Sequence, residues 1–110
     1  MADFAIKRND TAPSLVATLR DAEGVAVNLT GATVDLIMAA ATTGTVKVNT
    51  AATLTDAANG IVTYNWLAAD TSTAGDFNAE FEVTYSGGKK QTFPTDGYIK
   101  IVITADLDTQ

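Results

Sequence analysis

The segment Phe77-Asn78-Ala79-Glu80-Phe81-Glu82-Val83-Thr84-Tyr85 alternates apolar and polar side chains over its whole length. Successive side chains of a β-strand point to opposite faces of the sheet, so the odd-numbered residues share one face and the even-numbered residues share the other. One face is apolar, and the other carries two glutamates. This pattern is typical of an antiparallel strand that covers a core on one side and meets water on the other.

Shorter runs with the same period lie on both sides of this segment, and turn residues separate them. Asp21-Ala22-Glu23-Gly24, Asn59-Gly60 and Gly87-Gly88 contain glycines that can adopt the positive φ of tight turns. Regular spacing of short strands and turns favours a sandwich or a barrel. The apolar rows are Leu15, Ala17 and Leu19; Val34, Leu36 and Met38; Val62, Tyr64 and Trp66; and Ile99, Ile101 and Ile103, with edge strands expected at residues 4–7 and 46–48.

Two alanine-containing stretches have helix propensity but are too short for an isolated helix. We interpret Met38-Ala39-Ala40-Ala41 as the end of a strand that runs into a Thr-Gly turn. We interpret Leu67-Ala68-Ala69-Asp70 as a single helical turn that crosses from one sheet to the other. The predicted fold class is therefore all-β: an antiparallel immunoglobulin-like β-sandwich of about seven strands. The length of 110 residues suits one domain, so residues 1–110 are expected to form a single domain.

The chain contains no histidine and no cysteine. The first absence removes the commonest general base and the commonest metal ligand. The second excludes a disulfide, a thiolate zinc site and a cysteine nucleophile. We predict that the protein is not an enzyme, and that it has no catalytic residues, no cofactor and no metal site.

Acidic residues outnumber basic residues, and the formal net charge is −6. Nucleic acids and anionic membranes select surfaces rich in lysine and arginine, so we predict neither as a partner. Residues 1–4 lack the basic region and apolar run of a signal peptide, and no apolar stretch has the length of a membrane span. The expected site of synthesis is the cytoplasm, without a signal peptide.

The carboxylates are candidate metal ligands or acid–base groups. Asp56-Ala57-Ala58-Asn59-Gly60 lacks the alternating ligands and the distal glutamate of a calcium loop, so Asp56 and Asn59 are expected to cap a turn. Glu80 and Glu82 share one strand face about 7 Å apart. A glycosidase acid would need an apolar cleft to raise its pKa, and nothing in the sequence places this pair in one.

The run Ser86-Gly87-Gly88-Lys89 contains the Ser-x-x-Lys spacing of some hydrolases. That spacing needs one helical turn to bring the hydroxyl and the amine together, whereas two glycines favour a hairpin tip. The same glycines and lysines superficially resemble a phosphate loop. A hairpin with a basic tip explains them better, because lysines near strand ends keep sheet edges soluble.

Three aromatic residues are candidates for a sugar-stacking platform: Trp66, Tyr64 and Tyr98. Trp66 and Tyr64 share a face with Val62, so we place both in the core with their polar atoms hydrogen-bonded at its rim. Tyr98 precedes the isoleucine row and falls on its opposite face, so we expect it to be exposed. A single exposed tyrosine is ordinary on a protein surface.

The order of these motifs resembles a known group of viral domains. A glycine-led strand ends in Tyr64-Asn65-Trp66, Asp70-Thr71 follows, and Gly75-Asp76-Phe77 begins the next strand. The last strand follows Phe93-Pro94 and Gly97-Tyr98-Ile99. The beginning of the chain fits the same order: Ile6-Lys7-Arg8-Asn9-Asp10-Thr11 with Pro13, then the row Leu15, Ala17 and Leu19, then a turn, and then Val27-Asn28-Leu29-Thr30-Gly31-Ala32. Over most of the chain this order is similar to the N-terminal immunoglobulin-like domain of the phage baseplate upper protein (BppU) family.

The resemblance implies a non-enzymatic bacteriophage virion protein that docks through its sheet faces or edges onto neighbouring subunits of a tail or baseplate. It implies other virion proteins as partners, and a homo-oligomer or symmetric ring within the particle. Baseplate upper proteins continue into a long segment that carries receptor-binding trimers, whereas this sequence stops at Asp106-Leu107-Asp108-Thr109-Gln110. We therefore expect either a stand-alone accessory protein or a chain whose function departs from that of the family. The alternatives are a carbohydrate-binding or adhesion module and a capsid-surface decoration protein.

Overall fold

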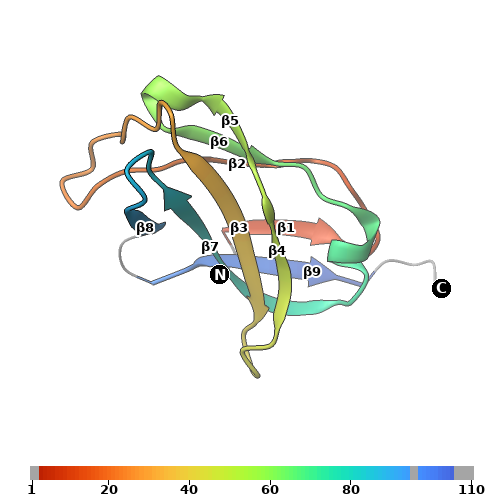
Figure 1. Ribbon diagram of the computed structural model, residues 1–110. Helices are drawn as coiled ribbons and strands as arrows, with labels where there is room; N and C mark the ends of the chain where they lie inside the picture. The colour runs from red at the N-terminus through yellow and green to blue at the C-terminus, as the bar shows by residue number, and fades with distance from the viewer. Residues whose placement is uncertain (1–2, 95–96, 106–110) are drawn as a thin grey trace.

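Strand β7 (Gly75–Thr84) contains most of the alternating segment and lies inside the larger of two sheets. The computed structural model describes residues 3–94 and 97–105 (Figure 1). Phe77, Ala79, Phe81 and Val83 of β7 are buried, whereas Glu80 lies on the opposite face and is half-buried. The alternation therefore predicts the buried face of this strand correctly.

The larger sheet is built around β7. Its order is β1 (Phe4–Lys7), β9 (Ile99–Thr104), β7, β3 (Thr33–Ala40) and β4 (Val46–Ala51). One edge of β7 is shared by two strands, because β9 pairs with its first half and β8 (Lys90–Phe93) pairs with its second half. The β7–β8 hairpin is the one that Gly87-Gly88 predicts.

The smaller sheet has the order β2 (Leu15–Thr18), β6 (Ile61–Tyr64) and β5 (Thr53–Asp56). Strands β4 and β5 follow each other directly, so the chain passes from the larger sheet to the smaller at Ala52 (Figure 1). The Ala52 N–H donates a hydrogen bond to the Val34 carbonyl at 2.8 Å, which fixes this corner to β3. Two short 3-10 turns complete the fold, η1 (Ala57–Asn59) and η2 (Ala68–Thr71).

The core lies between the sheets and takes side chains from both. Inward-facing residues of β3, β7 and β9 meet those of β2 and β6, and the apolar rows named from the sequence are all represented. The largest side chains with almost no exposed surface are Phe81, Phe93, Leu29, Leu36, Met38, Ile101 and Ile103. This packing of two sheets over one core confirms the predicted β-sandwich.

The structure adds two features that the alternation did not predict. Strands β5 and β8 carry only one inward apolar residue each, Leu54 and Phe93, so they show no period-two signal. Strands β1 and β9 pair in parallel, with Phe4 opposite Ile101. A parallel pair requires a long connection, and here the rest of the chain provides it.

Both alanine-containing stretches have the predicted form, since β3 ends at Ala40 and η2 is a single turn.

Gly60 ends η1 in a conformation and a space that only glycine fits. Its φ is +72°, and a Cβ built on it would lie 2.7 Å from the Val27 carbonyl oxygen and 3.0 Å from that of Leu19. The approach is close because the Leu19 N–H donates a hydrogen bond to the Gly60 carbonyl at 2.8 Å. Any side chain here would push the backbone of Leu19 and Val27 away from Gly60.

We predict that Gly60→Ala lowers the free energy of unfolding by about 2–5 kcal/mol, because backbone strain and a clash with backbone atoms add together. Gly44→Ala is the matched control: its φ is +76°, and a Cβ there would meet nothing within 4 Å. The control should lose only the conformational cost, about 1–2 kcal/mol. Urea unfolding measures both variants, and equal losses would contradict this description of Gly60.

Candidate docking surfaces

Glu80 and Glu82 lie on the outer face of the larger sheet, and both are half-buried. Lys90 of β8 approaches Glu82, with Nζ 3.6 Å from Oε1. Asp35 of β3 lies directly opposite Glu82 in the β3–β7 register. Like charges in facing positions of adjacent strands are unfavourable, so this part of the sheet is acidic at some cost to stability.

Asp56 and Asn59 lie at the turn that the sequence predicts, but the prediction that they cap it is wrong, because the Asp56 side chain makes no capping hydrogen bond and Gly60 ends the turn. The Asn59 amide donates a hydrogen bond from Nδ2 to Asp56 Oδ2 at 2.9 Å, across the single turn of η1. Among residues 3–94 and 97–105, no three carboxylates come close enough together to hold a metal ion. The Asp56 carboxylate therefore binds a residue of its own turn, Asn59.

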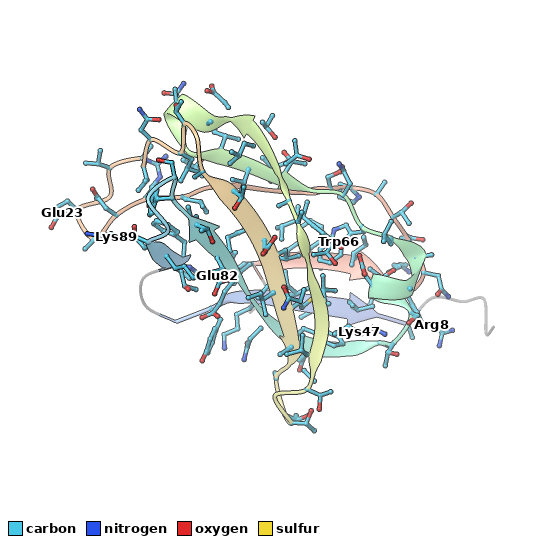
Figure 2. The ribbon with its side chains drawn as sticks, viewed as in Figure 1. Arg8, Glu23, Lys47, Trp66, Glu82 and Lys89 are labelled. Atoms are coloured by element: carbon cyan, nitrogen blue, oxygen red, sulfur yellow. The ribbon has the colours of Figure 1, made fainter. Side chains whose placement is uncertain are left out.

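Ser86 and Lys89 lie in the exposed tip of the β7–β8 hairpin, where Figure 2 labels Lys89. The tip is closed by hydrogen bonds from the Tyr85 N–H to the Lys89 carbonyl and from the Gly88 N–H to the Tyr85 carbonyl, each 2.8 Å long. These are the bonds of a hairpin, so the Ser-x-x-Lys spacing does not form the helical turn that a serine–lysine dyad needs.

Trp66, which Figure 2 labels, and Tyr64 are both buried in the core, as predicted. Trp66 stacks on Phe4 with ring centroids 5.7 Å apart and meets the Tyr64 ring edge-on at 5.2 Å. The prediction that both polar atoms are hydrogen-bonded is wrong for Trp66, whose buried Nε1 has no partner in the structure. The packing of its ring between two aromatic side chains decides its position instead.

Tyr98 is 51% exposed, as predicted, and it is the exposed aromatic ring of the described part of the chain. A sugar-stacking platform needs several exposed rings in a row. Among the described residues, Tyr98 is exposed alone, whereas Trp66 and Tyr64 are buried, so these rings do not form such a row.

The carboxylate of Asp70 is buried and was not singled out from the sequence. Its Oδ2 accepts a hydrogen bond from the Tyr64 hydroxyl at 2.6 Å and another from the Leu67 N–H at 2.9 Å. Asp70 thus binds the N–H of Leu67, the residue that precedes η2, and connects that turn to Tyr64 at the end of β6. An acidic residue three positions after the start of a short turn is one half of a capping box, and this spacing is the signal that could have revealed it.

Thr71, the next residue, is fully buried and joins η2 to the N-terminal segment. Its Oγ1 donates a hydrogen bond to the Asp10 carbonyl at 2.9 Å, and its own carbonyl accepts one from the Asn9 N–H at 3.0 Å. The Asp70-Thr71 pair therefore connects β6, η2 and the segment that follows β1. We call this set of contacts the crossover joint.

Burial raises the pKa of Tyr64 well above its usual value of 10.0. The hydrogen bond to Asp70 and the negative charge of that carboxylate act in the same direction. Tyr64 is therefore neutral in the folded protein over the whole physiological range, and its hydroxyl acts as a donor to Asp70.

The outer face of the larger sheet is polar and mildly hollowed. Two adjoining hollows of about 370 and 290 Å³ lie on it, and Ala41 and Asn78 line both. Tyr98 and Glu80 border the first hollow, and Lys100 borders the second. This face mixes acidic, basic and apolar side chains, which is typical of a face that meets water.

The outer face of the smaller sheet has a different composition. Apart from Asp56, which lies opposite Ile61 at the end of β5, its outward-facing strand residues are threonine, valine and isoleucine: Val16, Thr18, Thr53, Thr55, Ile61 and Thr63. We call these six residues the threonine face. Val16 is 61% exposed, and the Thr55 and Thr63 hydroxyls are hydrogen-bonded to each other. Asp56, at the end of β5, is the charged strand residue of this sheet and lies at its rim.

Comparisons with known proteins give one family and one fold. A family model described as "BppU N-terminal domain" matches residues 5–109. The crystal structure of CopC from Methylosinus trichosporium OB3b is similar with a TM-score of 0.52 and 14% identity, over 100% of this chain and 91% of that chain. At this identity the likeness shows a shared β-sandwich fold alone. No protein among the curated sequences matches.

We predict that Tyr64→Phe lowers the free energy of unfolding at pH 7 by about 1–3 kcal/mol, because it leaves a buried carboxylate with one donor fewer. Tyr85→Phe is the matched control, since the Tyr85 hydroxyl bonds Gln91 Oε1 at 2.8 Å at the surface. The control should change little. Chemical denaturation measures both, and equal losses would show that the crossover joint does not depend on this hydroxyl.

We also predict a change in the alkaline range. Below pH 10, the usual pKa of tyrosine, Tyr64 is protonated in both states and its contribution is fully present. Above it the unfolded chain ionises first, so stability falls by up to about 1.4 kcal/mol per pH unit until the folded pKa is reached. Tyr64→Phe should show a correspondingly smaller slope. Parallel curves for the two proteins above pH 10 would contradict the prediction.

Proposed function

Because the chain belongs to the BppU N-terminal domain family, we propose that it is a non-enzymatic structural module that docks onto neighbouring subunits of a phage virion. The observation that carries the proposal is the family match, since it spans nearly the whole chain. The family associates the protein with the phage baseplate and hence with the virion. In this proposal residues 1–110 act as one immunoglobulin-like domain with no catalytic, cofactor or metal site.

The two outer faces support a docking role. A sandwich offers sheet faces and edges to its neighbours, and the crossover joint holds the two sheets of this one together. Interfaces between proteins are depleted in charged residues at their centres, and the threonine face has that composition. We propose other virion proteins as partners, within a homo-oligomer or symmetric ring.

The charge of the chain supports the proposal that neither nucleic acids nor membrane surfaces are among its partners. A net charge of −6 opposes binding to phosphate-rich surfaces. Among the described residues, no helix has the length and apolar character needed to cross a bilayer. We propose synthesis in the host cytoplasm followed by assembly into the particle.

The alternatives make different predictions. A carbohydrate-binding or adhesion module needs accessible rings, and the described residues expose Tyr98 while Trp66 is buried. A capsid-surface decoration protein would use the same kind of sheet face but would be found on heads rather than tails. The position of the protein in the particle therefore separates this last alternative from the proposed function.

We predict that the protein is present in tails purified from the phage that encodes it, in a fixed ratio to the other baseplate proteins. The measurement is quantitative mass spectrometry of heads and tails separated on a density gradient. A major head protein and an abundant host cytoplasmic protein serve as controls for cross-contamination. Recovery with the heads would favour a decoration protein, and absence from both fractions would refute a structural role in the virion.

A further inference from the structure

Asn59 is the one asparagine of the sequence that a glycine follows. In such a dipeptide the backbone nitrogen of the glycine can attack the side-chain amide carbon of the asparagine, because glycine has no side chain to hinder the approach. The side chain of Asn59 is exposed, whereas Gly60 is buried. The reactivity of the pair therefore depends on whether the fold lets the Gly60 nitrogen meet the Asn59 amide.

We propose that Asn59-Gly60 is a site of spontaneous deamidation that is closed in the folded protein and opens when the η1 turn unfolds. A bond forms between the Gly60 nitrogen and Asn59 Cγ, the proton of that nitrogen leaves with the amide group as ammonia, and a succinimide ring remains. Water then adds to one of the two ring carbonyls and breaks its bond to nitrogen, which gives aspartate or isoaspartate. Water is the one co-reactant, so the inference is independent of the proposed function.

The side-chain amide of Asn59 is held by a carboxylate. Its Nδ2 donates a hydrogen bond to Asp56 Oδ2 at 2.9 Å, from the last residue of η1 back to the residue that precedes the turn. A hydrogen bond to a charged acceptor is stronger than one between neutral groups. While this bond lasts, Asn59 Cγ is not free to rotate onto the Gly60 nitrogen.

The attacking nitrogen is occupied as well. The Gly60 N–H donates a hydrogen bond to the Ala57 carbonyl at 3.1 Å, and the same carbonyl accepts another from the Leu29 N–H at 2.8 Å. The Gly60 carbonyl accepts a hydrogen bond from the Leu19 N–H at 2.8 Å. Leu19 and Leu29 are both core residues. Ring closure therefore requires Gly60 to separate from backbone that the core holds, which is a larger opening than the fraying of a surface turn.

The isoaspartate product does not fit the native space. Its main chain runs through the former side chain, so one more carbon atom separates residues 59 and 60. Gly60 already lies so close to Val27 that a Cβ on it would be 2.7 Å from the Val27 carbonyl oxygen. Either product also places a second negative charge beside Asp56, where the Asn59 amide now donates. Formation of isoaspartate therefore prevents this corner from refolding in its native form.

The test compares the folded full chain with the same chain held unfolded in urea, at equal pH and temperature. Peptide mass spectrometry measures the deamidated fraction at each asparagine over time. In urea, Asn59 should react before Asn28, which leucine follows, and before Asn49, which threonine follows. In the folded chain the rate at Asn59 should be at least about tenfold lower, because only the open fraction reacts.

Asp56→Ala removes the acceptor of the Asn59 amide. It should raise the rate at Asn59 in the folded chain at least about threefold, the effect of one hydrogen bond on an opening equilibrium. Asp76→Ala is the matched control, since it removes an exposed carboxylate from β7 of the larger sheet with the same change in charge. The control should keep the rate of the unchanged chain, and in urea all three chains should react equally.

Equal rates at Asn59 in the folded and unfolded chains would overturn the proposal. Earlier reaction of another asparagine in urea would do the same, as would an Asp56→Ala variant no faster than Asp76→Ala. Refolding provides a separate readout: after urea is removed, chains with isoaspartate at position 59 should be less stable than unmodified chains from the same sample. Modified chains with full stability would contradict the assigned fit at Gly60. None of these outcomes depends on the presence of the protein in tails.

Discussion

The buried carboxylate of Asp70 is the contact on which the arrangement of the two sheets depends. It holds the Tyr64 hydroxyl at the end of β6 and the Leu67 N–H at the start of η2. Thr71 then joins the same turn to the backbone of residues 9 and 10. The chain leaves the smaller sheet and enters β7 of the larger sheet through this joint, so the relative positions of the two outer faces are set here. The docking role proposed for this chain requires that rigidity.

The two faces then differ in a way that the core does not require. The outer face of the larger sheet places Asp35 opposite Glu82, a pairing that costs stability, whereas the centre of the threonine face, where Thr63 lies between Val16 and Thr53, carries no charge. Inward-facing residues are constrained by packing, but outward-facing residues are free to serve contacts with other molecules. Membership of the BppU N-terminal domain family gives this asymmetry a context, since a baseplate module has several neighbours to contact.

The strands with a strong period of two could be predicted from the sequence, and so could the burial of Tyr64 and Trp66 and the exposure of Tyr98. Strands β5 and β8 could not, because Leu54 and Phe93 provide too few inward apolar residues to form a pattern. The parallel pairing of β1 with β9 depends on tertiary packing between the two ends of the chain. The burial of the Asp70 carboxylate could not be predicted, because it depends on partners that the local sequence does not show. The threonine face required the register of β2, β5 and β6 before its composition became visible.

The central claim is that a rigid sandwich works by covering an outer face in an assembled particle. Hydroxyl-radical footprinting of the free chain and of the chain in intact tails tests it at single side chains. Val16 is 61% exposed in the isolated chain, so it should be labelled there and protected in the particle. Tyr64, which is buried in the joint, should be protected in both states. Equal labelling of Val16 in the two states would contradict the account, because the face assigned to docking would then be open to water in the assembly.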